Sequence, residues 1–159
     1  MKLRFLCANH RVQLENDIKK ALQFFRSGLD SGEFYLARSE WSEATPHLGC
    51  AFEVAEIILT KSVTGKEAFR ACDWLTSSTR LLAYSLYNQN YRIVAEDVIW
   101  MTINRIASQL GHNPTQTAWC SRHLEGLYGD LAFFRKGDLA SDPSRFTHAV
   151  ISNSTSRIH

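Results

Sequence analysis

Cysteine and histidine side chains in the last third of the chain have the spacing of metal ligands. In "WCSRH", Cys120 and His123 lie one helical turn apart, and His112 lies just upstream. Two such ligands would suit zinc, but a closed structural site needs four ligands. Neither Glu-x-x-His nor HExxH occurs. The sequence therefore predicts no metal site, with Cys120 in the core and His123 at the surface.

Other motifs of catalytic and nucleotide-binding sites are also missing from the sequence. There is no GxGxxG, no Walker loop and no GxSxG. Carboxylates neighbour one another at Glu53 and Glu56, which share a helix face, and at Glu96 and Asp97. A solvated polar face explains such pairs better than acid–base catalysis does. We expect no catalytic residue, no metal and no cofactor, and we rank an enzyme third among the functional classes.

The charge distribution favours neither nucleic acid nor a membrane as the partner. The net charge is +2, which is too small to imply either partner by itself. A recognition helix concentrates its basic residues, whereas the arginines here are spread over several helical segments: Arg70, Arg80, Arg92, Arg105, Arg122 and Arg135. No apolar run is long enough to span a bilayer, and the four cysteines frame no disulfide scaffold. These features favour a soluble, cytoplasmic protein with free thiols.

The elements that must position any site are helices, because apolar residues recur at helical spacing along most of the chain. No convincing strand pattern appears. We expect Asp30-Ser31-Gly32 to weaken or break the first helix, Gly111 to end the fifth, and Thr115 or Thr117 to cap the last. The periodic segments are residues 14–29, 33–40, 48–59, 68–86, 95–110 and 120–134. The sequence thus predicts an all-α fold of five or six helices in antiparallel hairpins.

The chain loses this periodicity after residue 136. Residues 1–136 are expected to form one helical domain, and residues 137–159 a flexible, serine-rich tail. Within the tail, "FTHAVI" is an apolar segment that could dock onto this chain or onto a partner.

Pro46 marks a corner between two of these helices. Proline has no N–H and is tolerated in the first turn of a helix, where that N–H would have no acceptor. Either Thr45 caps the helix directly before Pro46, or Ser42 caps it and Pro46 falls at the edge of the first turn. Both alternatives start a helix between Ser42 and Pro46, and neither allows one continuous helix from Glu33 to Thr60.

The residues around this corner resemble one tetratricopeptide repeat. Small residues at this spacing let two helices approach, and large residues fill the space between them. The residues that carry the resemblance are Gly32, Tyr35, Trp41, Ala44, Leu48 and Ala51. The resemblance implies helical hairpins that bind a protein segment without catalysis.

A second copy of this pattern does not follow at the repeat length of 34 residues, where Lys66 replaces Gly32 and Ser78 replaces Ala44. A shift of about fifty residues makes "ARSEW" and "YNQNY" equivalent corners and keeps the large residues. At that shift the small residues are lost, because Val94 falls on Ala44.

A different part of the chain resembles the flagellin-specific export chaperones, in the region of their third and fourth helices. The likeness covers residues 74–106 and consists of an aromatic–leucine start, a leucine pair, a polar corner rich in asparagine and an acidic–valine helix. The residues that carry it are Trp74, Leu75, Leu81, Leu82, Asn88, Asn90, Asp97 and Val98. Both families bind protein segments, so both resemblances imply an interaction protein.

The favoured function is a non-catalytic adaptor or chaperone that binds a protein segment in a groove between helices and that can self-associate. The alternative is a helical regulator that binds nucleic acid or a small ligand. Exposed aromatic residues anchor many interfaces. The candidate partner-binding residues are Tyr35, Trp41, Tyr84, Tyr87, Tyr91 and Trp119, whereas Trp74 and Trp100 are assigned to the core.

Overall fold

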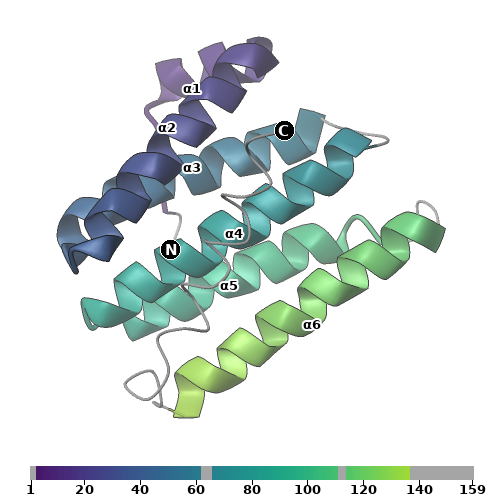
Figure 1. The fold of residues 1–159 in the computed structure, drawn as a ribbon. Coiled ribbons are helices and arrows are strands. Elements are labelled where there is room, and N and C mark those ends of the chain that lie inside the picture. The colour runs from purple at the N-terminus through teal and green to yellow at the C-terminus, as the bar shows by residue number, and fades with distance from the viewer. Residues whose placement is uncertain (1–2, 62–65, 111–113, 137–159) are drawn as a thin grey trace.

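The computed structural model describes residues 3–61, 66–110 and 114–136, and all regular structure in these ranges is helical. The predicted all-α fold is confirmed, with six helices in the described part of the chain (Figure 1). They are α1 (Ala8–Asn16), α2 (Ile18–Ala37), α3 (Trp41–Lys61), α4 (Lys66–Asn88), α5 (Arg92–Ala107) and α6 (Pro114–Lys136). The predicted tail, residues 137–159, lies outside the described residues.

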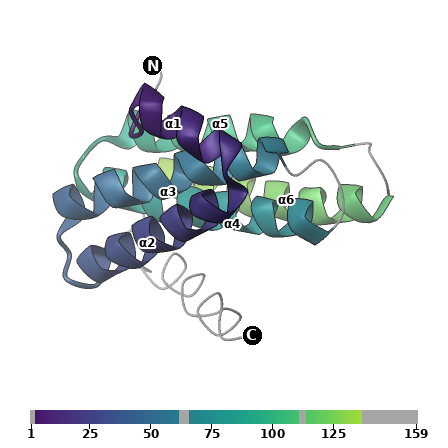
Figure 2. The ribbon, with the colours of Figure 1, turned by 90° about the horizontal axis from the view of Figure 1, so that it is seen from above.

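The helices form two layers that alternate along the chain. Helices α2, α4 and α6 are neighbours in one layer, which we call the even layer: Phe25 of α2 contacts Trp74 of α4, and Asp73 of α4 contacts His123 of α6. Helices α1, α3 and α5 form the odd layer. In Figure 2, α1 and α5 lie along the upper part of the view, and α2 lies below α3. Each helix packs on the next one along the chain.

The two hairpins α2–α3 and α4–α5 turn through equivalent hydrogen bonds. At the first corner, the N–H of Glu40 donates to the carbonyl of Tyr35 at 3.0 Å. At the second corner, the N–H of Tyr91 donates to the carbonyl of Leu86 at the same distance of 3.0 Å. Glu40 and Tyr91 are 51 residues apart in the sequence. The two predicted corners are therefore equivalent, at a register one residue longer than the fifty chosen from the sequence.

This register recovers the small residues that the shift of fifty had lost. Ala44 now corresponds to Ala95, and Gly32 corresponds to Ala83; all four are buried. At Gly32 a Cβ atom would collide with the side chain of Leu48. Small residues at these positions let the two helices of a hairpin approach closely, so the hairpins share their packing as well as their corners.

The first helix boundaries differ from the expectation. Helix α2 continues through Asp30 and Gly32 instead of breaking there, because Gly32 is held by its packing against α3. The break lies earlier, at Asp17, which separates α1 from α2. The Oδ1 atom of Asp17 accepts the N–H of Lys20 at 3.1 Å, which is the hydrogen bond of an N-cap residue.

Pro46 lies inside α3 rather than at its start. The helix begins at Trp41, and the N–H of Ala44 donates to the carbonyl of Glu40 at 3.0 Å. Thr45 and Ser42 are both helical residues, so neither is the predicted cap. The chain does turn before α3, as expected. The N–H that proline lacks would have met the carbonyl of exposed Ser42, which water can reach.

The last two helices also begin earlier than predicted. Helix α5 starts at Arg92, and α6 starts at Pro114, so the expected cap residues Thr115 and Thr117 lie within α6. Proline as the first helical residue has a fixed φ that suits the helix. Gly111 lies outside the described residues.

The core runs between the two layers, and α3 is its most buried helix. From Ala51 to Ala55 every residue of α3 is buried, including the carboxylate residue Glu53. Between α4 and α5, the hydroxyls of Thr79 and Thr102 share a hydrogen bond of 2.7 Å in the core. Each of these buried polar groups has a partner, as a stable interior requires.

Candidate functional site

Six accessible side chains of α4 form a stripe along the middle helix of the even layer. From Trp74 onward they are spaced by three or four residues, and Asp73 lies beside Trp74, so they share one face of the helix. We call them the α4 stripe: Asp73, Trp74, Ser77, Arg80, Tyr84 and Asn88. Helix α2 contacts this stripe on one side and α6 on the other.

Two aromatic rings of the stripe are held in place by rings from other helices. The ring of Trp74 lies 5.5 Å from that of Phe25 on α2. The ring of Tyr84 meets Trp41 edge to face, with centroids 5.4 Å apart. Trp74 and Tyr84 remain half-buried, so each presents part of its surface outward. Burial raises the pKa of Tyr84, and its hydroxyl stays protonated as a hydrogen-bond donor at neutral pH.

Charged residues of the stripe pair with α6. Arg80 donates a hydrogen bond of 3.0 Å from Nη2 to Oδ1 of Asp130, and its Nε lies 2.8 Å from Oδ2 as an ion pair. The Asp130 side chain is fully buried. Near the start of α4, Asp73 lies 2.8 Å from Nε2 of His123. These pairs fix the position of α6 beside the stripe and leave opposite charges interspersed along it.

A polar cluster fixes the corner end of the stripe. The carbonyl of Trp41 accepts three side-chain hydrogen bonds, from Thr45 at 3.0 Å, Ser85 at 2.9 Å and Gln89 at 3.1 Å. Gln89 also donates to Thr45 Oγ1 at 2.6 Å. Because these bonds join α3 to α4, Trp41 is oriented against Tyr84 before any partner binds.

The structure brings together only part of the predicted partner-binding set. Trp41 and Tyr84 contact one another. Tyr87 lies one turn beyond Tyr84, but its ring faces Phe134 of α6 at 5.0 Å.

The remaining predicted residues are dispersed. Tyr35 stacks on His47 at 5.5 Å, between α2 and α3. Tyr91 is exposed at the start of α5. Trp119 lies beside α4 near the other end of the stripe, where it contacts Phe69 at 5.7 Å.

Two tryptophans that the sequence placed in the core reach the surface. Trp100 of α5 is 36% exposed and meets the exposed ring of Tyr128 on α6 at 5.8 Å. Trp74 is only half-buried and belongs to the α4 stripe. The spacing of Asp73, Ser77 and Arg80 was the signal that could have identified this face, because polar residues three and four apart mark an accessible side of a helix.

Cys120 and His123, which have the spacing of metal ligands in the sequence, each make a different contact. His123 pairs with Asp73, and Cys120 lies within hydrogen-bonding reach of Cys72. Burial raises the pKa of Cys72 to about 12, so this thiol is protonated and a poor metal ligand. Within the described ranges no three His, Cys, Asp or Glu side chains could hold a metal ion, and His112 lies outside these ranges.

The carboxylate pair on α3 differs from the solvated face that we expected. Glu53 is only 3% exposed, and its carboxylate accepts backbone N–H groups of Phe5 and Leu6. Glu56 is half-buried, and burial raises the pKa of its carboxyl group. A long-range contact with the N-terminal residues has no local sequence pattern, so spacing alone could not reveal it.

Comparisons with models of protein families, with curated proteins and with solved structures find no match. The resemblances to tetratricopeptide hairpins and to flagellin-specific chaperones therefore stay predictions. No helix in the described part of the chain is long and apolar enough to cross a membrane.

Proposed function

We propose that this protein is a non-catalytic, cytoplasmic adaptor or chaperone that binds a segment of another protein on the α4 stripe. The observation that carries the proposal is the mixture of groups on this one face. Half-buried Trp74 and Tyr84 offer apolar surface, while Ser77 and Arg80 lie between them. Aromatic and arginine side chains are the residues that contribute most to binding at protein interfaces.

Binding would bury an apolar face of the partner segment against Trp74 and Tyr84. Neighbouring rings already fix both side chains, so little conformational entropy is lost when the partner docks. Alternating helical layers, as in this chain, are typical of proteins that present one continuous face to an extended partner. The four free cysteines support a reducing, cytoplasmic location.

The charges of the stripe favour a protein segment over nucleic acid. Arg80 is paired with the buried carboxylate of Asp130, and Asp73 adds a negative charge to the same face. A nucleic-acid interface needs a continuous basic surface to neutralise phosphates. The interspersed charges here would instead orient a polypeptide that carries both signs.

A peptide selection tests the proposal. Peptides are selected from a random displayed library against the full-length protein, and their affinities are then measured for two variants of equal added charge. Ser77→Arg places a long charged side chain in the middle of the stripe, and Asn104→Arg places one on the exposed surface of α5.

We expect Ser77→Arg to weaken the selected peptides at least tenfold and Asn104→Arg to leave their affinity unchanged. Circular dichroism checks that both variants fold. Selection of no peptide, or equal affinity for both folded variants, would overturn the proposal.

A further inference from the structure

The N-terminal residues before α1 are held on α3 by a buried carboxylate. We call residues 3–7 the N-terminal strap. Oε1 of Glu53 accepts the N–H of Phe5 at 2.6 Å, and Oε2 accepts the N–H of Leu6 at 3.2 Å. Glu53 is 3% exposed, so this carboxylate needs such partners in place of water. Two consecutive backbone N–H groups meet one carboxylate here because the chain bends at Leu6, and this contact with the main chain is independent of side-chain identity.

A glycine beside Glu53 makes room for the aromatic ring of the strap. Gly49 lies one turn before Glu53 on α3, and a Cβ atom there would collide with the ring of Phe5. The Sγ atom of Cys50 lies 3.7 Å from the carbonyl of Phe5. We call the face of α3 formed by Gly49, Cys50 and Glu53 the α3 notch. It offers space for a ring over Gly49, a carboxylate that accepts main-chain N–H groups and a thiol that donates to a main-chain carbonyl.

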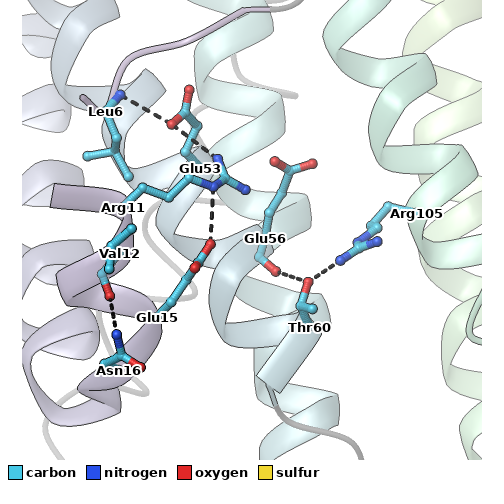
Figure 3. Close-up of polar contacts among 9 residues, drawn as sticks. All are labelled: Leu6, Arg11, Val12, Glu15, Asn16, Glu53, Glu56, Thr60 and Arg105. Atoms are coloured by element: carbon cyan, nitrogen blue, oxygen red, sulfur yellow. Dashed lines mark hydrogen bonds and ion pairs between the residues drawn. The ribbon is translucent and has the colours of Figure 1, made fainter. Parts of the chain in front are cut away.

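The strap and α1 each bury a single side chain, Leu6 in the strap and Leu14 in α1. The N-cap residue Cys7 makes no side-chain cap bond. Arg11 lies 3.7 Å from Glu53 and 3.3 Å from Glu15, with 43% of its side chain exposed. Figure 3 shows Arg11 reaching from α1 toward Glu53 on α3. Elements with few buried contacts open at a lower free energy than the rest of a protein.

We propose that the α3 notch is a binding site for a peptide segment with an aromatic residue followed by an aliphatic one, bent as the strap is at Leu6, and that the N-terminal strap is an exchangeable occupant of it. The partner supplies a ring for the space over Gly49 and two consecutive N–H groups for Glu53. A basic residue further along the segment, in the role of Arg11, adds an ion pair. When the strap leaves, the Glu53 carboxylate loses its two donors, which favours rebinding of the strap or binding of a segment that replaces it.

This site lies on the odd layer and is independent of the α4 stripe on the even layer, so either proposal can fail without the other. Release of the strap can be followed at Cys7, because the strap carries this exposed thiol. Partner binding at the notch would release the strap and free Cys7 from its 3.2 Å contact with His10.

Hydrogen exchange on the full-length protein tests whether the strap opens. We expect the amides of Phe5 and Leu6 to exchange at least tenfold faster than the buried amide of Val54 on α3. Gly49→Ala should accelerate the exchange of both strap amides at least tenfold more, because the new methyl group displaces the Phe5 ring. Gly126→Ala on α6 is the matched control, since a Cβ there meets nothing within 4 Å, and should leave the strap unchanged.

Binding in trans tests the site itself. The probe is a fluorescent peptide of residues 2–12 with serine in place of the cysteine. It should bind the full-length Phe5→Ala variant at least tenfold more tightly than the unmodified protein, since the weakened strap competes less. Adding Gly49→Ala to that variant should abolish binding, as should alanine at the aromatic position of the peptide.

Two results would overturn the inference. One is exchange of the strap amides only at the rate of global unfolding. The other is failure of the probe to bind the folded Phe5→Ala variant. If Phe5→Ala does not fold, the exchange experiment on the unmodified protein and on Gly49→Ala decides the matter.

Discussion

At the scale of single residues, the least expected environment is that of Glu56. It lies on α3 between α1 and α5, in the region where Arg11 and Arg105 point toward α3 from opposite sides (Figure 3). Burial raises the pKa of its carboxyl group, and the charges of Arg105 and Arg11 only partly oppose that effect. Arg105 instead donates to the hydroxyl of Thr60. Ionisation of the Glu56 carboxyl group therefore destabilises the folded state.

This cost predicts a pH dependence of stability. Because folding raises the pKa of Glu56, the native state binds more protons than the unfolded state between the unfolded and folded pKa values. The contribution of Glu56 to the free energy of unfolding must then fall as pH rises through that window. Glu56→Gln removes the charge, so it should stabilise the protein more at pH 7 than at pH 4.

Urea denaturation of both proteins at the two pH values measures this difference, and other titrating groups cancel in the comparison. An equal effect of Glu56→Gln at pH 4 and pH 7 would show that burial does not disfavour the ionised carboxylate.

At the scale of elements, the two hairpin corners place a non-glycine residue at positive φ. Ser39 has φ 57° and Asn90 has φ 66°, at equivalent positions of the repeated corner. This left-handed region costs an L-residue about 1–2 kcal/mol of conformational energy, and asparagine tolerates it better than serine does. Both residues are exposed, so their contribution to stability depends mainly on backbone conformation and little on side-chain packing.

Glycine should therefore stabilise the two corners unequally. We expect Ser39→Gly to raise the free energy of unfolding by about 0.5–1 kcal/mol, after the entropy that glycine adds to the unfolded chain is subtracted. Asn90→Gly should raise the free energy of unfolding by less, because asparagine already tolerates the left-handed backbone conformation. Urea denaturation ranks the two variants, and a larger gain at Asn90 would contradict the argument.

At the scale of the whole molecule, a buried ion pair joins α6 to α4. Asp130 is fully buried and Arg80 has 21% of its side chain exposed. Removing one member of a buried pair leaves the other charge without compensation, which costs about 3–5 kcal/mol. Replacing both members by apolar residues of similar size removes this cost.

Asp130→Ala should accordingly lower the free energy of unfolding by about 3 kcal/mol. The double variant Arg80→Met/Asp130→Leu should recover most of that loss. Equilibrium denaturation of the single and double variants measures both effects. If the double variant were as unstable as Asp130→Ala, the contribution of Asp130 would lie in packing or in other hydrogen bonds.

How much could be predicted from the sequence differs between the fold and the candidate site. Helices were predictable because apolar residues at helical spacing report local structure. The corner before α3 was predictable from Pro46, although Pro46 itself lies inside the helix. The repeat register was wrong by one residue, because large residues can be aligned at either shift while the corner hydrogen bonds fit only one.

The candidate site was less predictable. Trp41 and Tyr84 were identified as aromatic residues near corners, but their mutual contact depends on the packing of α3 against α4. Trp74 was assigned to the core because tryptophan is usually buried. Its half-burial follows from its position between α2 and the solvent, which no local pattern encodes.

The sequence by itself determined that the chain is helical, where its two hairpin corners lie, and that motifs of catalysis and nucleotide binding are missing, because these follow from local spacing and residue type. Only the tertiary structure decided that the helices alternate between two layers and that α4 presents its stripe. It also decided that Glu53 holds the backbone of Phe5 and Leu6. The physical reason is distance along the chain: these contacts join residues more than forty positions apart, and helical periodicity does not specify which faces meet.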